Sequence, residues 1–131
     1  MEISQRLVAC KHFRWMPGMR TLGDWRVINV DSDGVEVVTD LSEVVLFHSG
    51  DLPHIPSSLP DLTDPATLGC LLSLVREHWG SHAVTVANGF EEPHEVWSVH
   101  DGQFGGDGYG HEISRGATEA EVLVAALEAT P

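Results

Sequence analysis

The segment between Asp64 and Gly80 carries a complete set of helix signals and constrains the fold more than any other part of the chain. Asp64 is a favourable N-cap residue, Pro65 suits the first helical position, and Gly80 can end the helix. Apolar residues recur between these ends at intervals of three and four, which places them on one face: Leu68, Leu71, Leu72, Val75 and Trp79. The sequence therefore predicts an amphipathic α-helix over residues 65–79. Gly69 within it costs about 1 kcal/mol relative to alanine, so we expect close packing at that position.

Two shorter helices are predicted near the ends of the chain. Thr118 and Glu121 have the spacing of a capping box, which predicts a helix that ends near Thr130. The apolar face of that helix consists of Val122, Leu123, Ala126 and Leu127. Residues 2–11 can form a short helix at the other end of the chain.

Segments of alternating apolar and polar residues predict two groups of β-strands. The predicted strands span residues 25–30, 35–39, 44–47, 83–87, 95–100 and 112–115. The Asp and Gly residues of segment 31–34 predict a tight turn between the first two strands. The fourth and fifth strands are expected to be joined by a loop that contains Asn88, Gly89 and Pro93. The glycine-rich segment 102–110 is expected to form a long turn or loop.

These elements predict an α+β fold built in two parts. A small antiparallel β unit at the N-terminus precedes a layered domain in the order helix, antiparallel sheet, helix. We expect residues 1–131 to form a single compact domain, with a β-rich part over residues 1–50 and an α-β-β-α part over residues 59–131 as its subunits. The main core is predicted to consist of Leu72, Val75, Leu123 and Leu127.

Charge is distributed unevenly along the chain. Residues 1–26 contain five of the seven basic residues and two of the 20 acidic ones, so the other 18 carboxylates follow this segment. A net charge of −13 repels nucleic acid and membrane surfaces and attracts basic protein surfaces. We therefore expect a protein partner with a basic surface, and no direct contact with nucleic acid or with a membrane. The basic segment is expected to pair with acidic groups of the same chain or to form one pole of a contact between copies.

The carboxylates predicted to contact such a partner lie in the predicted strands or in the segments between them. They are Asp31, Asp33, Glu36, Asp40, Glu43, Glu91, Glu92 and Glu95. Carboxylates that project together from a rigid scaffold can engage a cationic surface as a unit. Carboxylates that are spread evenly, or are paired with the chain's own arginines, cannot.

A pattern between the first two predicted strands resembles a calcium-binding loop. Asn29, Asp31, Asp33 and Gly34, with Asp40 at the twelfth position, approach the spacing of an EF-hand. The twelfth position of an EF-hand is normally a bidentate Glu, and the flanks of an EF-hand are helices rather than strands. A hairpin turn is therefore favoured over a calcium site.

Histidines offer a second alternative, a metal-dependent enzyme. A transition metal could be ligated by a subset of His94, His100 and His111. On a strand, however, His94 and His100 share one face with Val96 and Ser98, which is typical of a half-exposed sheet. The chain has no GxSxG nucleophile motif and no Walker lysine. We therefore predict no cofactor, no metal and no enzymatic activity.

Cysteine content and hydropathy bear on the compartment. Cys10 and Cys70 are far apart and lack CxxC spacing, which favours two reduced thiols in a cytoplasm while leaving a disulfide open. Cys70 lies within an apolar helical pattern and is predicted to be a core residue. No apolar run approaches the roughly 20 residues that span a bilayer, and the first residues lack a secretory signal pattern. We expect a cytoplasmic protein of a bacterial host cell.

Three segments of the C-terminal half carry a resemblance to a known group of proteins. They are residues 59–80, which begin Leu-Pro-Asp-Leu and end His-Trp-Gly, residues 96–99, Val-Trp-Ser-Val, and the alanine-rich residues 118–129. Together they resemble small bacteriophage and prophage proteins with a phage ABA-sandwich domain. The resemblance implies a helix–sheet–helix layout and a phage accessory role, and it carries no catalytic residues.

Three functions follow from the charge pattern and this resemblance. The first is a phage-encoded binding protein that inhibits a host defence or nucleic-acid-binding complex, as anti-CRISPR proteins do, by placing carboxylates in a cationic channel. The second is a structural or assembly accessory of the phage, in which oligomerisation matters and charge only maintains solubility. The third, ranked last, is the histidine-dependent metalloenzyme.

Overall fold

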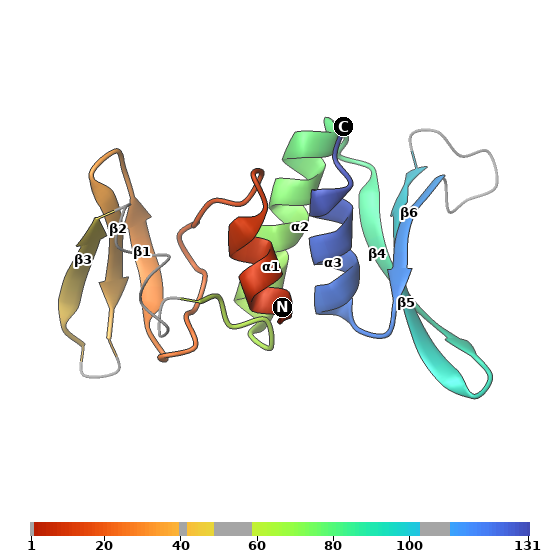
Figure 1. The fold of residues 1–131 in the computed structure, drawn as a ribbon, viewed down its shortest axis with the longest axis horizontal. Helices are drawn as coiled ribbons and strands as arrows, with labels where there is room; N and C mark the ends of the chain where they lie inside the picture. The colour runs from red at the N-terminus through yellow and green to blue at the C-terminus, as the bar shows by residue number, and fades with distance from the viewer. Residues whose placement is uncertain (1, 40–41, 49–58, 103–110) are drawn as a thin grey trace. The chain divides into compact units, whose positions relative to one another are not determined.

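The computed structural model describes residues 2–39, 42–48, 59–102 and 111–131 (Figure 1). The described residues form three helices and two separate three-stranded antiparallel sheets, which confirms the α+β class. The chain divides into two compact units, and each is described by itself below. The first unit comprises Met1–Ala9 and Phe13–Cys70, and the second comprises Cys10–His12 and Leu71–Pro131.

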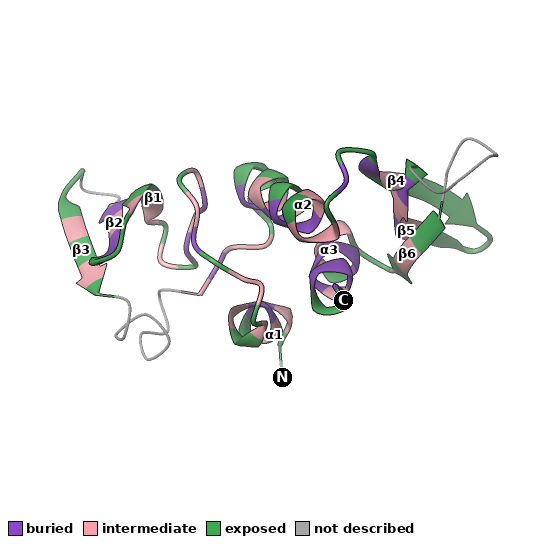
Figure 2. Cartoon of the chain, turned by 90° about the horizontal axis from the view of Figure 1, so that it is seen from above, coloured by how far each residue is buried: buried purple, intermediate pink, exposed green. Residues whose placement is uncertain are grey.

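The first unit contains one short helix and the first sheet. Its elements are α1 (Ile3–Ala9), β1 (Arg26–Val30), β2 (Gly34–Val38) and β3 (Val44–His48). The strands pair antiparallel in the order β1-β2-β3, as expected for consecutive hairpins. Val27, Val35 and Val37 are buried on one face of this sheet (Figure 2). The rings of Trp25 and Phe47 stack with their centroids 5.3 Å apart.

The turn between β1 and β2 is the predicted hairpin turn. The carboxylate of Asp31 accepts hydrogen bonds from the backbone N–H of Asp33 at 2.8 Å and of Gly34 at 3.2 Å. Asp31 therefore uses its oxygen to hold the turn, as expected for an Asx turn rather than for a calcium ligand. Gly34 has a φ of +155°, and a Cβ atom there would lie 2.0 Å from the carbonyl oxygen of Phe47. Only glycine fits this approach of two strands.

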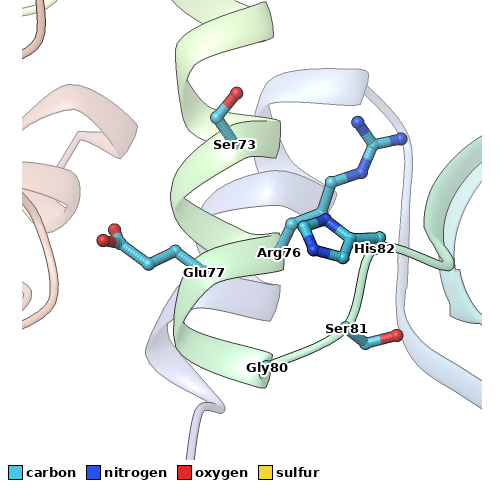
Figure 3. Close-up of a pocket in the computed structure, with 6 residues that line it drawn as sticks. All are labelled: Ser73, Arg76, Glu77, Gly80, Ser81 and His82. Atoms are coloured by element: carbon cyan, nitrogen blue, oxygen red, sulfur yellow. The ribbon is translucent and has the colours of Figure 1, made fainter.

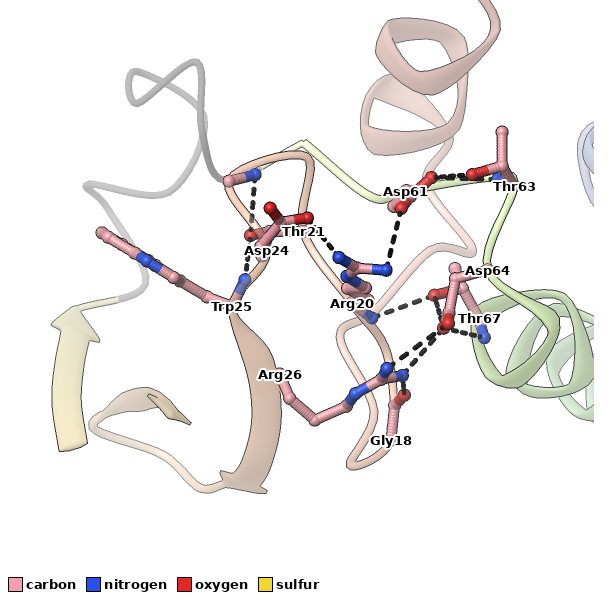
Figure 4. A network of polar contacts seen from close by, with 11 residues as sticks. Gly18, Arg20, Thr21, Asp24, Trp25, Arg26, Asp61, Thr63, Asp64 and Thr67 are labelled. Atoms are coloured by element: carbon pink, nitrogen blue, oxygen red, sulfur yellow. Dashed lines mark hydrogen bonds and ion pairs between the residues drawn. The ribbon is translucent and has the colours of Figure 1, made fainter. Parts of the chain in front are cut away.

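Two arginines of the basic N-terminal segment, Arg20 and Arg26, pair with carboxylates of their own unit, in line with the first of the two predicted alternatives (Figure 4). Arg20 forms ion pairs with Asp24 and with Asp61. Arg26, on β1, forms an ion pair with Asp64 at the start of the next helix. These ion pairs occupy two of the guanidinium groups that could otherwise have bound the phosphate groups of a nucleic acid.

Helix α2 (Pro65–Trp79) has the bounds and the caps that the sequence predicts. The carboxylate of Asp64 accepts hydrogen bonds from the backbone N–H of Thr67 at 3.0 Å and from its hydroxyl at 2.9 Å. Gly80 follows the helix with a φ of +65°, in the left-handed region. The close packing predicted at Gly69 is wrong, because a Cβ atom there would meet no described residue within 4 Å.

The buried face of α2 differs slightly from the predicted stripe. Leu71, Leu74 and Val75 are fully buried, whereas Leu72 is half-buried. Leu74 therefore occupies the core position that was predicted for Leu72. The other three predicted core residues, Val75, Leu123 and Leu127, are buried.

The second unit combines the end of α2 with the second sheet and the last helix. Its other elements are β4 (Val84–Glu91), β5 (His94–Asp101), β6 (His111–Gly116) and α3 (Glu119–Glu128). The strands pair antiparallel in the order β4-β5-β6, and α3 packs against β5 and β6. Within this unit, α3 and the end of α2 lie on the same side of the sheet (Figures 1 and 2). The indole N–H of Trp79 donates to the carbonyl of Ala126 at 2.9 Å and so joins the two helices.

Helix α3 begins with the predicted capping box. The hydroxyl of Thr118 accepts from the backbone N–H of Glu121 at 3.2 Å. The carboxylate of Glu121 reaches back to the backbone N–H of Ala117 at 3.1 Å, one residue before the usual partner. The first interaction satisfies a donor that the start of a helix leaves without a partner, and the second ties the residue before the cap to the first turn.

The β4–β5 hairpin corrects the predicted loop. Asn88 and Gly89 lie inside β4, opposite Trp97 and Val96 of β5, and only Glu92 and Pro93 remain as the turn. Eight consecutive residue pairs keep the register from Val84 to Glu91, so the strand continues through the Asn-Gly dipeptide. Predicted loop 102–110 lies outside the described residues except for Gly102.

Both cysteines are free thiols in the structure, as the sequence favoured. Cys70 is half-buried, and its Sγ lies 3.6 Å from the carbonyl oxygen of Pro17. Burial, together with the nearby charge of Asp64, raises the pKa of the Cys70 thiol. Among the described residues, no helix has the length and apolar character needed to cross a bilayer.

Candidate functional site

The candidate carboxylates of the first unit do not form a cluster. Asp31 and Asp33 lie at the β1–β2 turn, whereas Glu43 precedes β3 at the opposite end of the sheet. Glu36 lies within β2, between these ends, and is half-buried. Asp40 lies outside the described residues. This unit therefore spreads its acidic groups along a small sheet.

The candidate carboxylates of the second unit come together at the end of one hairpin. Glu91 pairs with His94 across the β4–β5 hairpin, and Glu92 forms its turn with Pro93. Glu95 follows directly on β5, and all three glutamates are exposed. Pairing with β6 begins only at residue 97, so the end of the hairpin projects past the third strand (Figure 1). We call residues 90–95 the acidic hairpin tip.

An aromatic side chain that the sequence analysis missed stands within this tip. Phe90 is 67% exposed and lies opposite Glu95. The sequence prediction placed Phe90 in a loop around Asn88. A residue in a loop is not assigned to a face of a sheet, so the exposure of Phe90 was not predicted. With the correct register, the period of two places Phe90 on the same face as Asn88 and Glu95.

Arg115 on β6 neutralises part of the charge around the tip. Its guanidinium binds Glu91 at 2.7 Å and Glu112 at 2.8 Å. The hydrogen bonds that Arg115 donates to Glu112 and to Glu91, together with the negative charges of these carboxylates, raise the pKa of Arg115. Two carboxylates, those of Glu91 and Glu112, thus bind one guanidinium.

The remaining carboxylates of the tip are available to a partner. The side-chain amide of Asn88 donates to Glu95 at 2.7 Å, which orients that carboxylate without neutralising it. Glu92 has no side-chain hydrogen bond or ion pair with any described residue. Glu92 and Glu95 are therefore the groups through which the tip can bind a cation.

The histidine face of the second sheet is confirmed, but its histidines are spread along the strand. His94, Ser98 and His100 lie on the same face of β5, whose other face carries the buried Val99. At about 3.3 Å per residue, His94 and His100 are about 20 Å apart along the strand and cannot share one ion. The imidazole of His100 instead contacts the hydroxyl of Ser98, with 2.8 Å between Nε2 and Oγ. No group of three or more potential metal ligands occurs within the part of the chain that the structure describes.

The chain matches no protein-family model, no curated protein and no solved structure. The resemblance of residues 59–129 to small phage proteins therefore remains a prediction. Function has to be inferred from the geometry and the charge of the acidic hairpin tip.

Proposed function

We propose that this chain is a small acidic binding protein that docks the acidic hairpin tip onto a basic surface of a protein partner. One observation carries the proposal: an aromatic ring that is 67% exposed, that of Phe90, stands among the exposed carboxylates of Glu92 and Glu95. Folded proteins usually bury such a ring, and interfaces are enriched in aromatic residues at their centres.

The two kinds of side chain contribute differently to such a contact. A buried aromatic anchor can contribute about 2 kcal/mol or more to binding, and it acts mainly on the dissociation rate. Carboxylates on the rim steer the approach of a cationic partner and mainly raise the association rate. Added salt should therefore slow the association of the two proteins, whereas it should leave the apolar contact of the aromatic anchor intact.

The finer proposal concerns the kind of partner. With the resemblance to phage proteins, the net charge of −13 favours a nucleic-acid-binding complex of a bacterial host, whose lysine- and arginine-lined channel the tip would occupy. The chain would then inhibit by competing with nucleic acid, without catalysing a reaction. A cytoplasmic location in the host cell goes with this proposal.

The test is quantitative capture from a bacterial lysate with tagged wild-type chain and tagged variants. Glu92→Lys reverses a charge that forms no ion pair with any described residue, and Phe90→Ala removes the anchor. We expect both variants to lose the same captured protein at least about tenfold, which corresponds to about 1.4 kcal/mol. Re-measured with the purified partner, Glu92→Lys should slow association, whereas Phe90→Ala should speed dissociation.

Glu43→Lys is the matched control. It changes the net charge by the same amount as Glu92→Lys, but it lies in the other unit and is also exposed. It should leave capture within about twofold of wild type. Equal loss with Glu43→Lys would mean that net charge, or a contact through Glu43 itself, attracts the partner, and unchanged capture with Phe90→Ala would remove the tip from the contact.

A second candidate, a phage assembly accessory, is favoured by a different surface. Val44 is 62% exposed and Leu46 is 44% exposed, and both lie on the face of the first sheet that also carries Glu36. Such a face suits a second copy of the chain. Light scattering would then give a stable oligomer that Leu46→Lys dissociates and Glu92→Lys leaves intact.

A further inference from the structure

A groove of about 490 Å³ lies at the end of α2 in the second unit (Figure 3). Its lining residues are Ser73, Arg76, Glu77, Gly80, Ser81 and His82. All of them come from the last two turns of α2 and the connection to β4. The volume falls within the range of small-molecule sites, roughly 300–1,000 Å³.

Arg76 is held in the groove by the backbone rather than by an acid. Its Nε–H donates to the carbonyl of Val84 at 2.8 Å, which fixes the stem of a half-buried side chain. Its two terminal nitrogens have no acceptor among the described residues. A guanidinium that is fixed through Nε offers its remaining N–H groups in the forked geometry that matches a carboxylate.

This state of Arg76 differs from that of other arginines in the chain. Arg20, Arg26 and Arg115 each form an ion pair with at least one Asp or Glu. Within the described parts of the chain, no carboxylate lies within ion-pair distance of Arg76, although the sequence has 20 acidic residues. Glu77 lines the groove, but its side chain projects away from the Arg76 guanidinium (Figure 3).

The geometry points to a binding site for a single carboxylate, with Arg76 as its forked donor and with His82 and Ser73 as further hydrogen-bond donors. His82 and Ser73 are exposed on the rim, so both can turn toward a ligand. The carbonyl groups at the end of α2 and the net charge of −13 both oppose a multiply charged anion such as phosphate. A monocarboxylate, either a small acid or the C-terminus of a peptide, is the ligand class that fits.

The test is a titration of the isotope-labelled full chain, followed by the amide signals in NMR spectra. Sodium acetate is added at constant ionic strength, with sodium chloride as the reference and sodium phosphate as the multiply charged anion. We expect acetate to shift the signals of residues 73–82 with a roughly millimolar Kd, because a four-atom ligand can contribute little more. Acetyl-trialanine with a free C-terminus and its C-terminal amide then distinguish a peptide end from a small acid.

Substitutions of Arg76 and His82, with one control, test whether these side chains bind the acetate. Arg76→Gln should weaken acetate binding at least tenfold, and the matched control Arg115→Gln, whose arginine is already paired with Glu91 and Glu112, should leave it unchanged. Because Arg76→Gln also removes the contact with Val84, His82→Ala serves as a variant outside the fold's hydrogen bonds and should weaken binding at least threefold. Tighter binding of the free peptide than of acetate identifies a chain terminus as the natural ligand, and equal binding identifies a small acid. Equal shifts with acetate and chloride, or an unchanged Kd in both variants, overturn the site.

Discussion

The guanidinium of Arg26 binds the carboxylate of Asp64 through two contacts, 2.8 Å from Nη1 to Oδ2 and 3.4 Å from Nη2 to Oδ1. The same carboxylate caps α2 through the backbone N–H of Thr67. Asp64 is 9% exposed, so solvent screens these interactions less than it screens a surface ion pair. One side chain thus fixes the start of the longest helix to a strand of the first sheet.

Replacing Asp64 with alanine should lower the free energy of unfolding by about 2–3 kcal/mol, of which about 1 kcal/mol is the lost cap and the rest is the loss of the carboxylate that accepts from Arg26 and from the hydroxyl of Thr67. Asp64→Asn keeps a good cap and loses only the charge, so it should cost about 1 kcal/mol. Urea unfolding followed by circular dichroism measures both. Equal losses for the two variants would show that capping contributes nothing at this site.

Stability should also depend on pH through Asp64. Burial favours a higher pKa for this carboxyl, but the hydrogen bonds from Arg26 and Thr67 and the charge of Arg26 outweigh burial, so its pKa lies below the ordinary 3.8. As the pH falls, the unfolded chain therefore protonates Asp64 before the folded chain does. The stabilisation by Asp64 is present at neutral pH, and it is lost as the pH falls below about 3.8 and through the pKa of Asp64 in the folded state. The difference in unfolding free energy between wild type and Asp64→Asn should shrink over that range. A constant difference down to pH 2.5 would contradict this assignment.

Gly34→Ala should destabilise the first sheet by at least about 2 kcal/mol, because the added Cβ would collide with the backbone and the residue would keep an unfavourable φ. The collision is with the carbonyl oxygen of Phe47, at 2.0 Å. Stacking of Trp25 on Phe47 should weaken at the same time, so tryptophan fluorescence reports the loss along with the denaturation midpoint. A midpoint equal to that of wild type would mean that the strands separate there without cost.

Gly69→Ala should have the opposite effect. The position is exposed within α2, and no described residue lies within 4 Å of the added Cβ, so alanine gains helix propensity without a clash. We expect a stabilisation of about 0.5–1 kcal/mol in urea unfolding. A loss of stability would indicate that something packs on this side of α2 after all.

Local signals predicted the helices well. Asp64, Pro65 and Gly80 fixed the ends of α2 because capping depends on residues that are adjacent in sequence. The same holds for the capping box of α3 at Thr118. The choice of Leu74 over Leu72 for the core depends on which neighbours the helix meets, and a periodicity with nearly equal alternatives does not contain that information.

The candidate site was less accessible to prediction. Asn88-Gly89 is a strong turn dipeptide by itself, and pairing with the whole of β5 overrides it. With that turn misplaced, the sequence could show that Glu91, Glu92 and Glu95 are close along the chain, but it could not show that Phe90 stands among them. Arg115 lies on β6, more than 20 residues along the chain from Glu91, so no local sequence pattern indicates that the two residues pair.

The acidic hairpin tip has a further consequence for how copies of this chain behave toward one another. β4 is an edge strand, and an edge that ends in an exposed aromatic ring is a typical starting point for fibrils. The glutamates beside Phe90 oppose such assembly, because stacking two of these edges would bring like charges together. The ring can therefore stand in water without seeding aggregation.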